Sequence, residues 1–122
     1  MFLDEALAAA RHDLGKYVHF EARWIAEDAD ATSVREALRA DLLRTRRGPR
    51  GEHGVGKVWA DARAEIALAM ACDGRPLDLA DIDRRVVELA AAAERLDDLS
   101  LPELRDVAAL ARSLAEAIRA LG

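Results

Sequence analysis

The spacing of the apolar residues is the feature that most constrains the fold of this chain. Over most of its 122 residues, apolar side chains recur every three or four positions. That spacing matches the 3.6-residue turn of an α-helix and places the apolar side chains on one face. Alanine (27 residues) and leucine (17 residues) dominate the apolar set, and both favour helix over strand. The chain is therefore predicted to be all-α.

The pattern predicts four long helices and one short helix, the second along the chain. Short connections after the third and fourth helices favour antiparallel neighbours. We expect one domain over residues 1–122, an antiparallel up-and-down helical bundle with the short helix on its side or within a connection. The predicted helices cover residues 3–29, 34–45, 55–70, 79–96 and 104–118.

Helix-capping patterns indicate several of the helix ends. Ser33 with Glu36, and Ser100 with Glu103, have the spacing of capping boxes. In a capping box, the two side chains satisfy free backbone N–H groups at the start of a helix. The string DGRP at residues 73–76 is predicted to end the third helix through its glycine and proline.

Composition excludes several classes of protein. Cys72 is the only cysteine, so neither an internal disulfide nor a multi-cysteine zinc site can form, and a reducing compartment fits best. No apolar stretch approaches the roughly 18 residues of a membrane span, and no signal-peptide pattern begins the sequence. The net charge of −5 argues against general nucleic-acid binding. We expect a cytoplasmic protein that uses no cofactor and no metal.

The predicted first helix carries a basic stripe opposite its apolar face. With Leu14 at the centre of the buried face, a rotation of about 100° per residue places His12, Lys16, His19 and Arg23 roughly 140–200° away. Aromatic residues border this stripe, as they do on surfaces that dock other proteins. The alternative interpretation is a solvated helix face, which is normal for an amphipathic helix.

The string HDLGK at residues 12–16 resembles the phosphoacceptor region of two-component signalling proteins. In those families, a histidine projects from a helical bundle to meet a receiver domain. The resemblance implies that His12 accepts the phosphoryl group and that Lys16 neutralises its charge. It also implies that Gly15 leaves room for the receiver. The likeness covers five residues, with the glycine and the lysine in the reverse order to the phosphotransfer pattern.

Two other interpretations of this string are open. It also resembles the HD phosphohydrolases, which hold a metal through a His-Asp step, an upstream histidine and a downstream aspartate. No histidine precedes His12, and His19 lies about 10 Å away along a straight helix, too far for joint chelation. Alternatively, Gly15 is a packing residue that lets another helix approach closely.

A basic segment over residues 44–57 contrasts with the acidic remainder of the chain. The segment is formally +4, and the other residues together are −9. Within it, GEHGVGK has the glycine and lysine spacing of a phosphate-binding P-loop. Val58 follows where magnesium binding requires serine or threonine, and no apolar strand precedes the string. The segment is interpreted either as a solvated loop or as a contact for an anion, an acidic protein or nucleic acid. The candidate contacts are Arg44, Arg46, Arg47, Arg50 and Lys57.

Together these features predict a helical protein-interaction or signalling module without catalysis of its own, whose partner is another protein. Histidine phosphotransfer with a receiver domain is the first alternative, and anion or nucleic-acid binding through the basic segment is the second. The alanine- and leucine-rich helix faces also allow a homodimer. Cys72 is interpreted as a small packing residue.

Overall fold

The computed structural model describes residues 2–15, 28–42, 46–48 and 51–121. Within these residues it contains five α-helices, one 3₁₀ helix and one two-stranded hairpin, so the all-α fold class and the helical bundle are confirmed. The elements are α1 (Phe2–Leu14), α2 (Ala31–Leu42), β1 (Arg46–Gly48), β2 (Gly51–His53), α3 (Val55–Asp73), α4 (Ala80–Ala93), η2 (Leu96–Asp98) and α5 (Leu101–Arg119). The shortest of the five α-helices is α2, with 12 residues.

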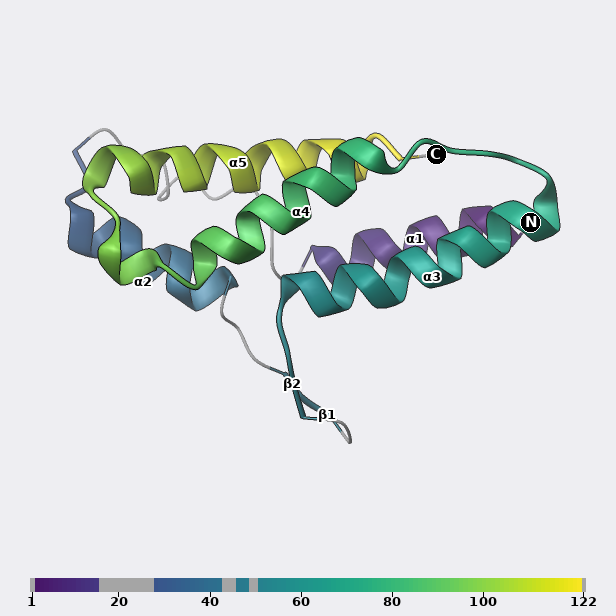
Figure 1. Cartoon of the computed structure of the whole chain (residues 1–122), viewed down its shortest axis with the longest axis horizontal. Coiled ribbons are helices and arrows are strands. Elements are labelled where there is room, and N and C mark those ends of the chain that lie inside the picture. Colours follow the sequence, from purple (N-terminus) through teal and green to yellow (C-terminus); the bar gives the residue numbers. More distant parts are fainter. Residues whose placement is uncertain (1, 16–27, 43–45, 49–50, 122) are drawn as a thin grey trace.

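The helices α1 and α3 lie side by side and antiparallel (Figure 1). Their pairing is fixed where α1 begins and α3 ends. The backbone N–H of Leu3 donates to Asp73 Oδ2 at 2.8 Å, and Arg75 Nη1 lies 3.2 Å from Asp4 Oδ1. The helix α2 packs against α4 and α5, while α3 also contacts α4, so one core runs through all five helices.

The core consists mainly of side chains at the predicted apolar positions. Burying a leucine or isoleucine side chain stabilises the fold by about 1.5–3 kcal/mol relative to leaving it exposed. Every helix contributes, which explains how a chain poor in aromatic residues forms one continuous core. The largest fully buried side chains are Leu3, Leu7, Leu14, Leu38, Leu42, Ile66, Leu89, Leu96, Leu104 and Leu114.

The first helix ends earlier than predicted. It stops at Leu14, and Gly15 lies in a turn where its N–H donates to Arg11 O at 3.0 Å. A Cβ at Gly15 would lie 3.0 Å from the same oxygen, a crowded contact that glycine avoids. Among the described residues, only the backbone of Arg11 and His12 comes within 4 Å of that position, so no described helix approaches Gly15, and the packing interpretation stays a prediction. The rest of the predicted helix, residues 16–27, lies outside the described residues.

The start of α2 also differs from the prediction. Asp30 caps this helix, because its Oδ1 accepts from the backbone N–H of Ser33 at 2.7 Å. Hydrogen bonds from the backbone and the side chain of Ser33 hold the pKa of Asp30 below its usual value. The predicted capping box of Ser33 and Glu36 is wrong, since an aspartate one turn earlier supplies the acceptor and the helix begins at Ala31.

Other predicted helix ends are confirmed. Ser100 and Glu103 form the predicted capping box at the start of α5. The helix α3 begins at Val55 and ends at Asp73, and Gly74 caps it with a φ of 62°, a left-handed conformation that glycine adopts without strain. The fourth helix is shorter than predicted, because α4 ends at Ala93 and a turn leads into the 3₁₀ helix η2.

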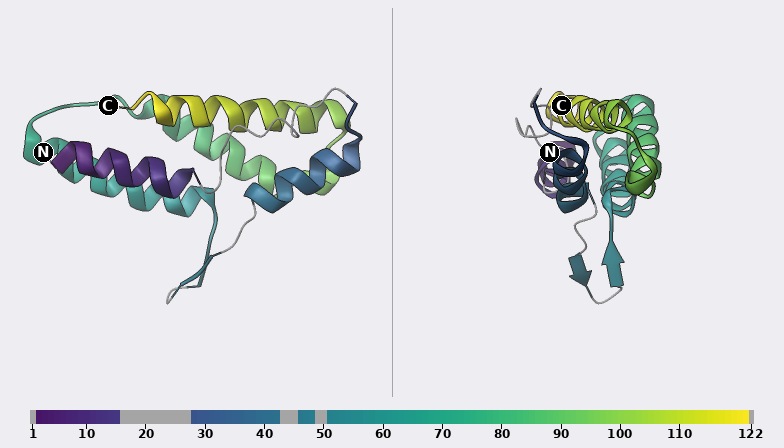
Figure 2. Two further views of the ribbon diagram at one scale, coloured as in Figure 1. Left: turned by 180° about the vertical axis from the view of Figure 1, so that it is seen from behind. Right: turned by 90° about the vertical axis from the view of Figure 1, so that its left-hand side faces the viewer.

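Part of the basic segment forms a β-hairpin, which the sequence did not predict. β1 pairs with β2 in antiparallel register, with Arg46 opposite His53, Arg47 opposite Glu52 and Gly48 opposite Gly51. The hairpin extends away from the helices (Figure 1 and Figure 2). Its strands are three residues long and rich in arginine and glycine, so they carry no alternation of apolar and polar residues.

Candidate functional site

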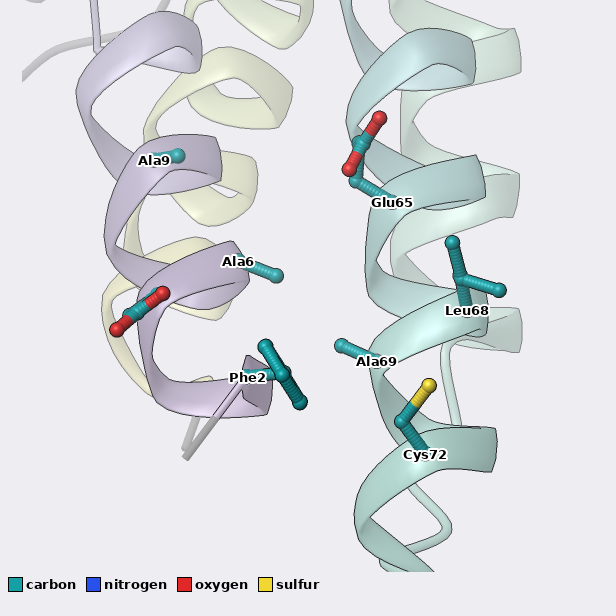
Figure 3. A pocket seen from close by; sticks show the side chains of 8 residues that line it. Phe2, Ala6, Ala9, Glu65, Leu68, Ala69 and Cys72 are labelled. Atoms are coloured by element: carbon teal, nitrogen blue, oxygen red, sulfur yellow. The ribbon is translucent and has the colours of Figure 1, made fainter.

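A groove of about 490 Å³ lies between α1 and α3, on the surface of the molecule (Figure 3). Because the two helices are antiparallel, Phe2 lies near Cys72 at one end, and Ala9 lies near Glu65 at the other. This volume falls within the range of about 300–1,000 Å³ that is typical of ligand sites. The groove is lined by Phe2, Glu5, Ala6 and Ala9 from α1, and by Glu65, Leu68, Ala69 and Cys72 from α3.

Two large apolar side chains of this groove are exposed to solvent. Phe2 and Leu68 are each 65% exposed, although most large apolar side chains of the described residues are buried in the core. They come from helices on facing sides of the groove, so one partner can cover both. The two side chains therefore expose apolar surface on both sides of the groove.

The outward position of Leu68 follows from the composition of α3. Ile66 and Ala69 are buried in the core, while Leu68 and the neighbouring Cys72 face outward on the same helix. A helix that is apolar on more than one side is normally covered on more than one side. The core covers one side of α3, and the groove is an uncovered part of the other.

Two charged side chains are found among the described residues that line the groove, and both are acidic. Glu5 belongs to α1 and Glu65 to α3, and both are exposed. Neither carboxylate forms a hydrogen bond or an ion pair with another described residue. The groove therefore combines exposed apolar surface with two carboxylates that have no counter-charge among the described residues.

A cluster of polar side chains joins α3 to α4. Asp83 Oδ1 accepts from Trp59 Nε1 at 2.7 Å, and both Asp83 oxygens accept from Arg63 Nε, at 2.8 and 2.9 Å. Partial burial raises the pKa of Asp83, but the hydrogen bonds from Arg63 and Trp59 outweigh burial, so the pKa lies below its usual value. Asp83 is thus a charged carboxylate near neutral pH, and it fixes the helix that forms one wall of the groove.

The structure places His12 on the surface, as predicted. It lies in the last turn of α1 and is exposed. The carbonyl groups at a helix C-terminus carry partial negative charge, which disfavours a phosphoryl group there. Lys16, His19 and Arg23 lie outside the described residues, so the predicted basic stripe is described only at His12. Phosphotransfer through His12 stays a prediction.

The predicted basic site is divided between two elements. Arg46 and Arg47 belong to β1, whereas Lys57 lies in α3 and its Nζ is 2.9 Å from Asp61 Oδ1. Arg44 and Arg50 lie outside the described residues. The strand β2 joins a two-stranded hairpin instead of a buried sheet, so the P-loop spacing has no phosphate-binding fold around it.

The interpretation of Cys72 as a packing residue is wrong. Cys72 is exposed at one end of the groove and is not a packing residue in the core. Across the ranges that the structure describes, no three side chains of histidine, cysteine, aspartate or glutamate gather as a metal-binding set would. The groove was not predicted from the sequence. The apolar residues on more than one side of α3 are a signal for it, but their spacing does not show which side another helix covers.

Comparison of this chain with protein-family models, curated proteins and solved structures finds no match. None of the helices in the described part of the chain is long and apolar enough to cross a membrane.

Proposed function

We propose that this protein is a small helical interaction module, acting in signalling or assembly without catalysis of its own, and that it contacts its partner through the groove between α1 and α3. The observation that supports the proposal is the exposure of Phe2 and Leu68 on facing helices of one groove. A cytoplasmic location belongs to the same proposal, because an exposed thiol at Cys72 suits a reducing compartment.

The energetic case rests on these two side chains. Full burial of a phenylalanine or leucine is worth about 1.5–3 kcal/mol, and both side chains are 65% exposed. Covering the pair therefore recovers roughly 2–4 kcal/mol before the cost of association. The alanines at positions 6, 9 and 69 let a partner approach closely between them.

Cys72 provides a direct test, because a photo-crosslinker attached to its thiol sits at the end of the groove. In an extract of the source cells, the labelled protein should form a small number of discrete protein adducts. Leu68→Ser should remove them, because it deletes apolar contact without disturbing the core. As a matched control, the same label is placed on α5 in Cys72→Ser/Ala109→Cys. Equal adducts from position 109, or adducts unchanged by Leu68→Ser, would contradict the proposal.

The basic hairpin is a second candidate contact, favoured by its extension away from the helices (Figure 2). If it binds anions, single-stranded DNA should bind with strong salt dependence, and Arg46→Ala/Arg47→Ala should weaken binding and lower the salt slope. Affinity that does not change in this variant would exclude the hairpin as the contact.

Phosphotransfer is tested by incubating the protein with phosphorylated receiver domains, or with a sensor kinase and ATP. An acid-labile label that disappears in His12→Gln would assign the phosphoacceptor. The absence of a label across a broad set of receivers would refute this alternative.

A further inference from the structure

We infer that the groove between α1 and α3 binds an amphipathic helix of another protein, one that carries lysine or arginine on both sides of its apolar stripe. This inference rests on the proposed function and specifies the chemistry of the partner. Three properties of the groove support it: its shape, the charge of its two walls and the unfavourable consequence of filling it with a second copy.

The shape of the groove suits a helix. Its walls are two antiparallel helical segments that lie side by side, residues 2–9 of α1 and 65–72 of α3, each about 10–12 Å long by helical rise. Between them, Ala6 and Ala69 have short side chains that leave room for a third helix (Figure 3). A helix in such a groove contacts it through side chains at positions i, i+3 or i+4, and i+7. Two turns of a partner would therefore fill the groove, with large apolar residues against Phe2 and Leu68.

The charges define the flanks of that partner. Glu5 lies on one wall and Glu65 on the other, and neither is paired with a described residue. Among the residues that the structure describes, no arginine or lysine lines the groove. A partner with basic residues on both sides of its apolar stripe can pair with both carboxylates, whereas an acidic partner is repelled by both.

The same charges disfavour a second copy of this chain as the occupant. A two-fold dimer uses the same surface on both subunits. It would bring two copies of Glu5 and two of Glu65 together at one interface, without a basic residue from the described lining of either groove. Like charges that face each other across an interface are destabilising, so a basic partner fits better.

The test uses two fluorescein-labelled helical peptides of about 14 residues, roughly four turns, with identical leucine and alanine stripes. One carries lysine and the other glutamate at the flanking positions. Fluorescence anisotropy should show about 10-fold tighter binding of the lysine peptide. Glu5→Gln/Glu65→Gln should weaken its binding by about 5-fold and remove most of the preference, while Leu68→Ser should weaken the binding of both peptides.

Two control variants separate the groove from general effects. Glu94→Gln alters an exposed acid at the end of α4, and Val87→Ser alters an exposed apolar residue on α4; both should leave binding unchanged. Circular dichroism confirms folding, which is expected because every substituted side chain is exposed. Equal affinity for the two peptides would overturn the inference. So would an effect of Glu94→Gln on binding as large as that of Glu5→Gln/Glu65→Gln.

The experiment also distinguishes this inference from the function on which it rests. If the peptides show no charge preference but the Cys72 adducts still depend on Leu68, the groove is a contact surface and the proposed partner chemistry is wrong. If the adducts also ignore Leu68, both proposals fail. A concentration-dependent dimer in sedimentation that Leu68→Ser abolishes would identify a second copy as the occupant and overturn the basic-helix inference.

Discussion

Asp83 joins α3 to α4, so substituting it tests the packing that holds one wall of the groove. The carboxylate accepts from the indole of Trp59 at 2.7 Å and from the guanidinium of Arg63 at 2.8 and 2.9 Å. Asp83→Ala removes the acceptor for both donors. Asp83→Asn keeps a side-chain oxygen for Trp59 and removes the negative charge that faces Arg63.

The expected magnitude follows from the burial of the donors. Trp59 is only 4% exposed, so leaving its N–H without an acceptor costs about 1–3 kcal/mol. Arg63 is exposed and can bind water instead, so the loss of its hydrogen bonds to Asp83 adds little to the cost in stability. We expect Asp83→Ala to lower the free energy of unfolding by about 2 kcal/mol, and Asp83→Asn to lower it by about 1 kcal/mol or less.

The pH dependence of unfolding provides an independent measurement. The pKa of Asp83 in the folded protein lies below 3.8, its usual value, so the unfolded chain binds the proton more tightly. The contribution of the carboxylate is therefore complete above about pH 5 and is lost as the pH falls through the folded-state pKa. The stability difference between the natural protein and Asp83→Asn should shrink over that acidic range.

Urea unfolding followed by far-ultraviolet circular dichroism measures these changes. A double-mutant cycle with Trp59→Phe isolates the indole hydrogen bond, and the double variant should cost less than the two single variants added together. Losses below about 0.5 kcal/mol for Asp83→Ala, or strict additivity in the cycle, would refute the assignment of this cluster as the link between α3 and α4.

Three further predictions concern stability and use the same unfolding assay. Ser100→Ala should cost about 1 kcal/mol, because it removes the capping acceptor of α5; no loss would show that the cap contributes nothing. Gly74→Ala should cost about 1–2 kcal/mol because of its positive φ. Gly54→Ala, which also has open space around its Cβ but a negative φ, should cost less, because alanine there only weakens the N-cap of α3. Leu104→Ala should cost about 2–5 kcal/mol because Leu104 is buried in the core, and Leu68→Ala should cost less than about 0.5 kcal/mol because Leu68 is exposed. Equal losses for the two variants would contradict this difference in burial.

The helices and their buried faces could be predicted because helical periodicity is a local property. Spacing alone puts Leu14 at the centre of the buried face of the first helix, and Leu14 is fully buried. The capping box at Ser100 was equally predictable, since its two residues are three apart along the chain and cap the helix through hydrogen bonds to each other. Asp30 was not predicted as the cap, although aspartate is as good an N-cap residue as serine and its Oδ1 accepts from the backbone N–H of Ser33.

The candidate site was much less predictable. The sequence directed attention to His12 and to the arginines of residues 44–57, which stand out by residue type. The groove is built instead from Phe2, Leu68 and small residues that resemble any other core positions. Whether an apolar residue on α3 is buried or exposed depends on which neighbour lies beside it, and spacing along the chain does not carry that information.

The sequence by itself determined an all-α chain, the helices from Val55 onward and the separation of a basic segment from an acidic remainder. These properties depend on residues that are close together along the chain. Only the tertiary structure decided that α1 pairs with α3, that Leu68 faces outward, and that Glu5 and Glu65 line the same groove. About 60 residues separate those carboxylates along the chain, and only the antiparallel packing of α1 on α3 brings them to opposite walls of one site.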